Sequence, residues 1–392
     1  MAFATSVAQE SGAQDTVEHL IEASVQEKIF PGCSYCLAQG KEIYLNGVKG
    51  SQSFTALDED GEEERIPITS ESVFDVDSLT SSIITTSLLM KAVDGGKIKL
   101  TDKVSRHIHG FSTFGKSLIR IEDLIRHRSG LPIGESFYQE FTAIRKEIPF
   151  GTAVGRGAAQ QVLMQINRMT PRAAPGQVSQ YSEVNSLLLG FLLEELWARR
   201  LNELAQQFLF QPLGIRQSGF IDHALVRKGD IRPDFRLLVP TEECPWRKRV
   251  IRGEVWDGNT WAIGGVSGEA GLFANAQDIT ILVQALLGSY RGVGAPLISP
   301  EIVRSFLSFP EEENQWACGW MTTKSAFGIE PPEPFQHSLG AISPSGCAVW
   351  FDPQSSVSFV FLSNRAMSGR ANRDLSLLLP RLLKAVWGSL LL

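Results

Sequence analysis

Residues 74–86, Phe-Asp-Val-Asp-Ser-Leu-Thr-Ser-Ser-Ile-Ile-Thr-Thr, constrain the fold of this chain more than any other stretch. They predict a short extended segment and then a helix that ends at Gly95-Gly96. The helix is indicated by apolar residues at helical spacing: Leu79, Ile83, Ile84, Leu88, Met90 and Val93. Asp75 and Asp77 are residue types that favour the position before a helix. Ser78 lies at the first turn, where free backbone N–H groups and the helix dipole can support a nucleophile and its oxyanion.

The segment Ser78-Leu79-Thr80-Ser81 resembles the active-site motif of the serine β-lactamase and penicillin-binding-protein superfamily, in particular its class C-like esterases and D-alanyl carboxypeptidases. The motif of that family is Ser-x-x-Lys, because residues three apart share a helix face and the amine can reach the hydroxyl. The resemblance implies that Ser78 is the acylated nucleophile. Ser81 stands in the lysine position, so the main proton-transfer partner of Ser78 is missing.

Residues 180–185, Gln-Tyr-Ser-Glu-Val-Asn, resemble a second family motif, Tyr-Ser-Asn or Tyr-Ser-Asp-x-Asn. The resemblance implies that Tyr181 is a catalytic base and that Asn185 binds substrate, whereas Glu183 departs from the motif. A tyrosine has a reference pKa of about 10, so it acts as a base only where cations stabilise the phenolate. The missing lysine at Ser81 therefore weakens Tyr181 as well.

The stretch His337-Ser338-Leu339-Gly340 resembles the third motif, Lys-Thr-Gly or His-Thr-Gly, which lies on the strand lining the family's pocket. The resemblance implies that His337 is catalytic and that Gly340 is a substrate-binding position. Ser338 and Leu339 are degenerate positions: Leu339 holds the glycine place unless the register slips to Gly340, and a leucine there would crowd the groove. The Ser78 N–H and a backbone N–H on the strand after His337 are expected to hold the oxyanion.

The most specific match is residues 264–273, Gly-Gly-Val-Ser-Gly-Glu-Ala-Gly-Leu-Phe, which are similar to the family's G-G-V-A-G-H-A-G-L-F. Glu269 replaces the histidine of that pattern, and Trp256 replaces another histidine just upstream. The glycines persist because they shape tight turns. His127 lies in a stretch similar to I-x-x-L-L-x-H-x-S-G-L-P, and we interpret it as a structural histidine bonding a loop backbone rather than as a base.

The matches run in order over residues 15–390 and imply an α+β fold of the β-lactamase/transpeptidase type. An antiparallel sheet flanked by helices is expected at about 15–75 and 316–392, with a mostly helical lobe inserted at about 76–315, all within one domain, 15–392. Residues 1–14 are expected to be a flexible N-terminus. Helices are predicted at 14–29 and 375–391, and strands at 33–38, 43–50, 316–321, 346–353 and 357–365.

Charge and cysteine content exclude several classes of function. A net charge of −6 gives no basic surface for nucleic acid, and no apolar run is long enough for a transmembrane segment. Five scattered cysteines and the absence of a secretory signal pattern before Gly32 indicate free thiols and a cytoplasmic location. Cys33 and Cys36 share a predicted strand, so their thiols face opposite sides. The sequence predicts no metal and no cofactor.

The departures from the family pattern cluster at chemical positions, whereas the glycines and the apolar frame persist. They predict a β-lactamase-related serine hydrolase homologue that is catalytically impaired, or a pseudoenzyme that keeps the fold as a binding module. The alternative is an active serine esterase or D-alanyl carboxypeptidase-like hydrolase, with Ser78 as nucleophile and Tyr181 as base. A small-molecule or peptide ligand fits both hypotheses, and the sequence identifies no protein partner. A purely structural oligomer subunit has no signature in this sequence.

Overall fold

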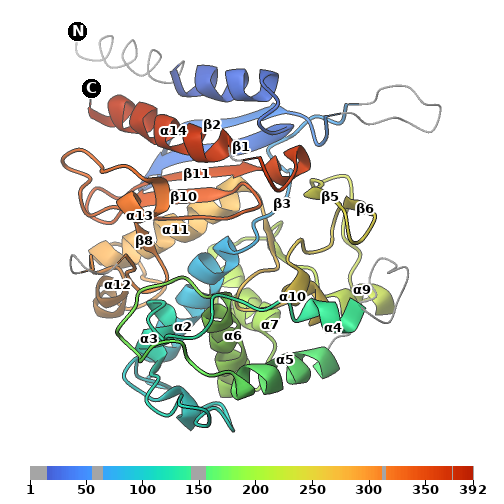
Figure 1. Ribbon diagram of the computed structural model, residues 1–392. Coiled ribbons are helices and arrows are strands. Elements are labelled where there is room, and N and C mark those ends of the chain that lie inside the picture. Colours follow the sequence, from blue (N-terminus) through green and yellow to red (C-terminus); the bar gives the residue numbers. More distant parts are fainter. Residues whose placement is uncertain (1–15, 55–64, 143–155, 311–314, 373, 392) are drawn as a thin grey trace.

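A computed structural model describes residues 16–54, 65–142, 156–310, 315–372 and 374–391, which form a sheet lobe joined to a helical lobe (Figure 1). The predicted flexible segment 1–14 lies outside these residues. Six antiparallel strands form the main sheet in the order β2-β1-β11-β10-β9-β8. They are β1 (Gly32–Gln39), β2 (Glu42–Gly50), β8 (Met321–Thr322), β9 (Leu339–Ile342), β10 (Ala348–Asp352) and β11 (Val357–Ser363). The predicted α+β architecture is confirmed.

Strand β1 lies inside the sheet, between β2 and β11, and is buried along almost its whole length. Because successive side chains of a strand point to opposite faces, β1 sends Cys33, Tyr35 and Leu37 into one core and Cys36 into the other. The two thiols therefore face opposite sides, as predicted, and all five cysteines are buried and free. Gly40 makes the tight turn to β2 with a φ of 61°.

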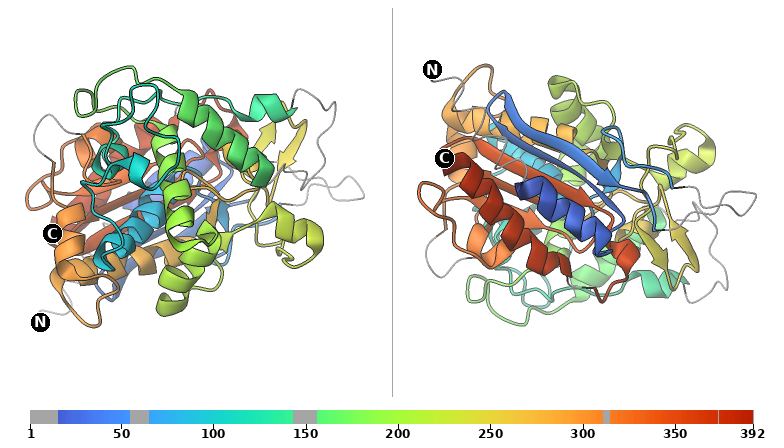
Figure 2. Two further views of the ribbon diagram at one scale, coloured as in Figure 1. Left: turned by 90° about the horizontal axis from the view of Figure 1, so that it is seen from below. Right: turned by 90° about the horizontal axis from the view of Figure 1, so that it is seen from above.

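Three helices cover the two faces of the sheet. The helix at residues 16–26 and α14 (Asp374–Leu391) lie side by side on one face (Figure 2). The opposite face is covered by α11 (Ala276–Arg291), whose Gln284 Nε2 donates to the Ala38 carbonyl of β1 and to Ser358 Oγ of β11 at 3.2 and 2.8 Å. The sequence placed α11 in the helical lobe, but its apolar stripe packs on the sheet as well.

The helical lobe leaves the sheet after β2 and returns to it at β8 (Figure 1). Its core contains α6, which is apolar nearly all round and buried through most of its length. Its helices are η1 (Ser81–Thr85), α2 (Thr86–Asp94), η2 (Val104–Arg106), α3 (Ile121–Ile125), α4 (Tyr138–Thr142), α5 (Arg156–Arg168), α6 (Glu183–Trp197), α7 (Leu201–Ala205), η3 (Gln206–Phe210), α8 (Gln211–Leu213), α9 (His223–Lys228), α10 (Gly258–Ala262) and α12 (Pro300–Phe306). Helices α13 (Thr323–Phe327) and η4 (Arg365–Ser368) belong to the returning segment.

A small sheet fixes the segment that carries Ser78. Strand β3 (Phe74–Asp75) pairs with β7 (Leu272–Ala274), which also pairs with β4 (Gly219–Phe220). The Leu272 N–H donates to Thr80 Oγ1, and Thr85 Oγ1 donates to the Gly268 carbonyl. These bonds hold residues 264–272 against the helix that begins beside Ser78. A separate hairpin joins β5 (Glu242–Cys244) and β6 (Arg249–Ile251).

Among the described residues, no helix combines the length and the apolar character needed to cross a membrane.

Candidate active site

A cavity of about 780 Å³ opens beside Ser78, and segments from both lobes form its walls. It brings together six of the residues singled out in the sequence: Asp77, Ser78, Tyr181, Glu183, Trp256 and Glu269. The other lining residues include Glu135, Tyr138, Trp246, Asp257, Trp316, Ile342, Ser343 and Arg370. Ser78 is partly exposed to this space, whereas Asp77, Glu269 and Trp316 are buried.

Ser81 does not line the cavity, and its side chain turns back onto the chain. Its hydroxyl donates to the Ser78 carbonyl at 2.9 Å. The helix is π-helical over η1, because the Thr86 N–H reaches the Ser81 carbonyl five residues back and Thr86 Oγ1 also donates to it at 3.0 Å. The sequence predicted a regular α-helix here; π-turns of this kind are rare and often occur at functional sites.

No lysine is present among the described residues that line the cavity, and Arg370 is the only cationic side chain among them. Arg370 already forms a two-bond ion pair with Glu242, at 2.5 and 2.8 Å, and lies over the Trp256 ring. Within this lining, therefore, no amine takes the place of the lysine that is missing at Ser81.

Tyr181 reaches the cavity but is paired with an acid. Its hydroxyl donates to Glu269 Oε1. Burial, with the nearby Glu269 carboxyl, raises the pKa of Tyr181 well above its ordinary value, and burial likewise raises the pKa of Glu269. Tyr181 therefore keeps its proton at neutral pH. A phenolate base needs the opposite environment, one rich in cations.

Asp77 lies next to one of the groups expected to bind the oxyanion. Its backbone is in the left-handed region, with a φ of 51°, a strained conformation for a residue other than glycine. Burial, followed by Asp75 and Asp257, raises the pKa of the Asp77 carboxyl, and hydrogen bonds from the Ser78 and Ser345 backbone N–H groups oppose that shift. The Ser78 N–H is one of the two donors expected to hold the oxyanion. Ser345 lies in the turn after β9 and is therefore not the strand donor that was expected. The Asp77 carboxyl lies close to both N–H groups.

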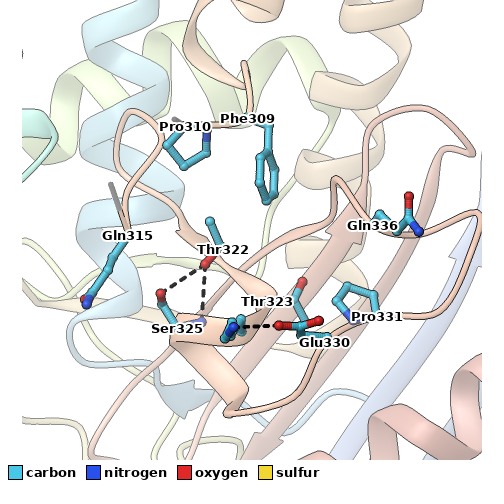
Figure 3. A pocket seen from close by; sticks show the side chains of 10 residues that line it. Phe309, Pro310, Gln315, Thr322, Thr323, Ser325, Glu330, Pro331 and Gln336 are labelled. Carbon is cyan, nitrogen blue, oxygen red and sulfur yellow. Dashed lines mark hydrogen bonds and ion pairs between the residues drawn. The ribbon is translucent and has the colours of Figure 1, made fainter. Parts of the chain in front are cut away.

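The prediction that His337 joins Ser78 and Tyr181 in one cleft is wrong. His337 is exposed, lies before β9 and packs its ring edge-on against Phe309 at a centroid distance of 5.1 Å. Phe309 lines a different cavity, together with Gln336 and Thr322 (Figure 3). The Ser78 cavity meets the chain at the other end of β9, at Ile342 and Ser343. Each strand residue advances about 3.3 Å, so this shift along the strand removes His337 from the site.

Ser338, Leu339 and Gly340 are also absent from the described lining of the Ser78 cavity. Leu339 is fully buried in the core, so it does not crowd a substrate groove as expected. Ser338 is buried and its hydroxyl donates to the Phe335 carbonyl. Gly340 is needed for packing rather than for substrate, because a Cβ there would lie 2.5 Å from the Phe327 ring.

Asn185 is fully buried and holds a loop instead of lining the cavity. Its Oδ1 accepts from Ser129 Oγ at 2.6 Å, and its Nδ2 lies 3.2 Å from His127 Nδ1. The Ser182 N–H donates to the same His127 nitrogen at 3.1 Å, which confirms the structural role predicted for His127. Burial lowers the pKa of His127 to about 3, so the ring is neutral. It packs between Tyr181 and Trp316.

Sequence reasoning missed the acidic character of the cavity. Glu183 Oε1 accepts from Asn259 Nδ2 at 2.7 Å, and burial raises the pKa of Glu183 to about 8. Asp75 lies behind the site, where its Oδ2 accepts from the Trp256 N–H at 2.6 Å and burial raises its pKa to about 6. Asp75 and Asp77 lie inside an apolar run, and this pattern could have predicted buried carboxyls at the site. Buried carboxyls rarely occur without a function or a partner.

Comparisons with known proteins match this chain over most of its length. The family profile described as "Beta-lactamase" matches residues 17–380. A protein of Escherichia coli K12 named putative D-alanyl-D-alanine carboxypeptidase is 28% identical over 331 residues, which cover 78% of this chain and 72% of that protein.

Solved structures share the fold. A penicillin-binding protein homologue from Caulobacter crescentus has a TM-score of 0.68 at 16% identity, covering 96% of this chain and 97% of that one. EstCE1, a hydrolase with promiscuous acyltransferase activity, has a TM-score of 0.66 at 19% identity, covering 95% of this chain and 99% of that one.

Proposed function

Because this chain belongs to the beta-lactamase family, a family of serine hydrolases, we propose that it is a catalytically impaired member that keeps the Ser78 cavity for binding. One observation carries the proposal: the described lining of the cavity contains the nucleophile but no lysine to accept its proton. The Ser81 hydroxyl that stands in the lysine position bonds to the Ser78 carbonyl instead.

Two further contacts support impairment. Tyr181 is held protonated by its bond to Glu269, so it cannot accept the Ser78 proton directly. The Asp77 carboxyl draws on the Ser78 and Ser345 N–H groups, so a developing oxyanion would have to displace it. Losing one positioned proton-transfer group costs about 10²–10⁴-fold in rate, and losing one oxyanion donor about 10²–10³-fold. Either loss alone would make acylation of Ser78 slow.

The alternative is an active esterase or carboxypeptidase; the relative from Escherichia coli K12 is named a putative D-alanyl-D-alanine carboxypeptidase, and EstCE1 is titled a hydrolase. One observation favours it: Ser78 opens onto a cavity of about 780 Å³, large enough for a small acyl substrate. In that case Tyr181 would pass the serine proton on to Glu269, its hydrogen-bond partner.

Intact-mass spectrometry with an excess of a small activated ester and of a β-lactam separates the two. We expect wild-type protein to gain no acyl mass within the time in which an active relative would be fully acylated, and to match Ser78→Ala. Rapid stoichiometric labelling that is absent in Ser78→Ala would refute the proposed impairment and establish the active hydrolase.

A further inference from the structure

The Ser78 cavity has an uncompensated acidic lining. Among the described residues, five acidic ones line it, Asp77, Glu135, Glu183, Asp257 and Glu269, against the single guanidinium of Arg370, which is engaged by Glu242. Burial, and then the neighbouring carboxyls, raise the pKa of Asp77, Glu183 and Glu269 and so favour their neutral forms. A bound cation would favour the ionised forms again, whereas a ligand carboxylate would oppose them.

Glu269 lines this cavity and has a buried carboxyl oxygen without a hydrogen-bond partner in the described part of the chain. The residue is only 5% exposed, and its Oε1 accepts from the Tyr181 hydroxyl. Its Oε2 is buried and has no hydrogen-bond partner among the described residues. An unsatisfied buried oxygen of a carboxyl group costs about 1–3 kcal/mol or more, so the site is suited to a ligand that brings an N–H donor.

The walls around the carboxyls are aromatic. The ring of Tyr138 packs against that of Trp246 at a centroid distance of 5.0 Å, and Trp256 and Trp316 also line the cavity. The chain already places cations on these rings: the guanidinium carbon of Arg247 lies 4.4 Å from the Trp246 centroid, and that of Arg370 lies 4.9 Å from the Trp256 centroid. Ring faces attract cations and also pack well against apolar or aromatic groups.

We propose that the cavity binds a ligand with a primary ammonium group on an apolar or aromatic body, and that the ammonium donates to Glu269 Oε2. This inference rests on the proposed function, since it names the class of ligand that the same cavity retains. An N–H donor satisfies the free oxygen, the positive charge offsets the carboxyls, and the aromatic walls cover the body of the ligand.

Three probes of one shape test the proposal: benzylammonium, benzyl alcohol and benzoate. Their affinities are measured by isothermal titration calorimetry at a pH of about 8.5, above the pKa of Glu183 of about 8. We expect benzylammonium to bind at least about tenfold more tightly than the alcohol, the size of one charge-assisted hydrogen bond, and benzoate to bind more weakly still. Equal affinities, or a preference for benzoate, would overturn the proposal.

A matched pair of variants locates the contact. Glu269→Gln should weaken benzylammonium binding at least about tenfold and leave benzyl alcohol binding unchanged. Glu301→Gln, the same change at an exposed position on α12, should alter neither. If Glu269→Gln folds and binds benzylammonium like the wild type, the assignment to Glu269 is wrong; if it does not fold, the three-probe series on wild-type protein still decides.

The acylation rate of the wild-type protein, measured beside the three-probe series, separates this inference from the proposed function. Absence of selective binding in a protein that acylates slowly would sink only the inference. Selective binding in a protein that acylates rapidly would sink only the proposed impairment.

Discussion

At the scale of single residues, the account depends on one missing amine. Ser81→Lys places a lysine three residues after Ser78, on a chain long enough to reach the cavity. Burial among aromatic walls should lower the pKa of the amine, and the carboxyls of the cavity should oppose that shift, so the fraction of amine that is neutral can accept the serine proton. We expect acylation by a small activated ester to rise at least about tenfold, measured as acyl mass gained per unit time.

Ser81→Met is the matched control, because it adds similar length without an amine and should give no gain. A folded Ser81→Lys protein whose amine lies beside Ser78 but which gains nothing over Ser81→Met would show that the amine does not limit this site.

The residues of the site differ in how well the sequence alone could predict them. Ser78 and Tyr181 were found because each lies in a local motif beside a helix start. The residues of such a motif are neighbours in the chain, so the motif can be read directly from the sequence. His337 was misplaced, because its motif match fixed a strand but not which end of that strand meets the cavity. Glu269 and Trp256 were recognised as departures, but their partners, Tyr181 and Asp75, are distant in sequence and appear only in three dimensions.

At the scale of elements, the helix that follows Ser78 packs closely against Gly319, in the segment that leads back to the main sheet. Gly319 has a φ of 77°, and a Cβ there would lie 1.9 Å from Thr86 Oγ1 of α2. Gly319→Ala should therefore lower stability by the cost of a left-handed alanine, about 1–2 kcal/mol, plus an overpacking cost of about 1–3 kcal/mol. Chemical denaturation measures the loss.

Gly328→Ala isolates the clash. Gly328 has a similar φ of 71°, but a Cβ there would meet nothing within 4 Å. It should show the left-handed cost alone. Equal losses in the two variants would mean that the contact with Thr86 does not hold α2 in place.

The elements themselves were largely predictable. The strands at β1, β2, β10 and β11 follow from β-branched and aromatic runs bounded by turn residues, and α14 follows from its apolar periodicity. The π-turn at η1 was not predictable from the spacing of apolar residues. It is accompanied by a hydrogen bond from the Thr86 hydroxyl to the Ser81 carbonyl, and such a bond does not change the apolar periodicity of the helix. The packing of α11 on the sheet was missed, because the apolar stripe of an amphipathic helix does not identify the surface against which the helix packs.

At the scale of the whole molecule, the buried carboxyls make stability depend on pH. The folded pKa of Glu183, about 8, lies above its ordinary value, so between about 4.5 and 8 the folded state binds more protons than the unfolded state. Stability from this group is therefore lost as the pH rises through that window. The neutral buried rings of His127 and His223, with pKa values lowered to about 3, act oppositely, and only below about 6.5.

Between pH values of about 6.5 and 8.5, then, only the carboxyl effect remains, and the melting temperature should fall as the pH rises. Glu183→Gln should flatten this fall in differential scanning fluorimetry, and Glu301→Gln should not. A wild-type melting temperature that rises over this range would contradict the acidic character assigned to the site.

The central claim is that the described lining of the Ser78 site contains no amine and that the Asp77 carboxyl competes with an oxyanion for the Ser78 N–H. The acylation rate of the Asp77→Gly, Ser81→Lys double variant tests it most directly, because glycine suits the φ of 51° and frees that N–H. Asp77→Asn, Ser81→Lys is the control that keeps an acceptor beside that N–H. We predict that the glycine variant acylates at least about a hundredfold faster than wild type and faster than the asparagine variant, with no labelling once Ser78 is alanine. A folded double variant that acylates no faster than the wild type would contradict the account.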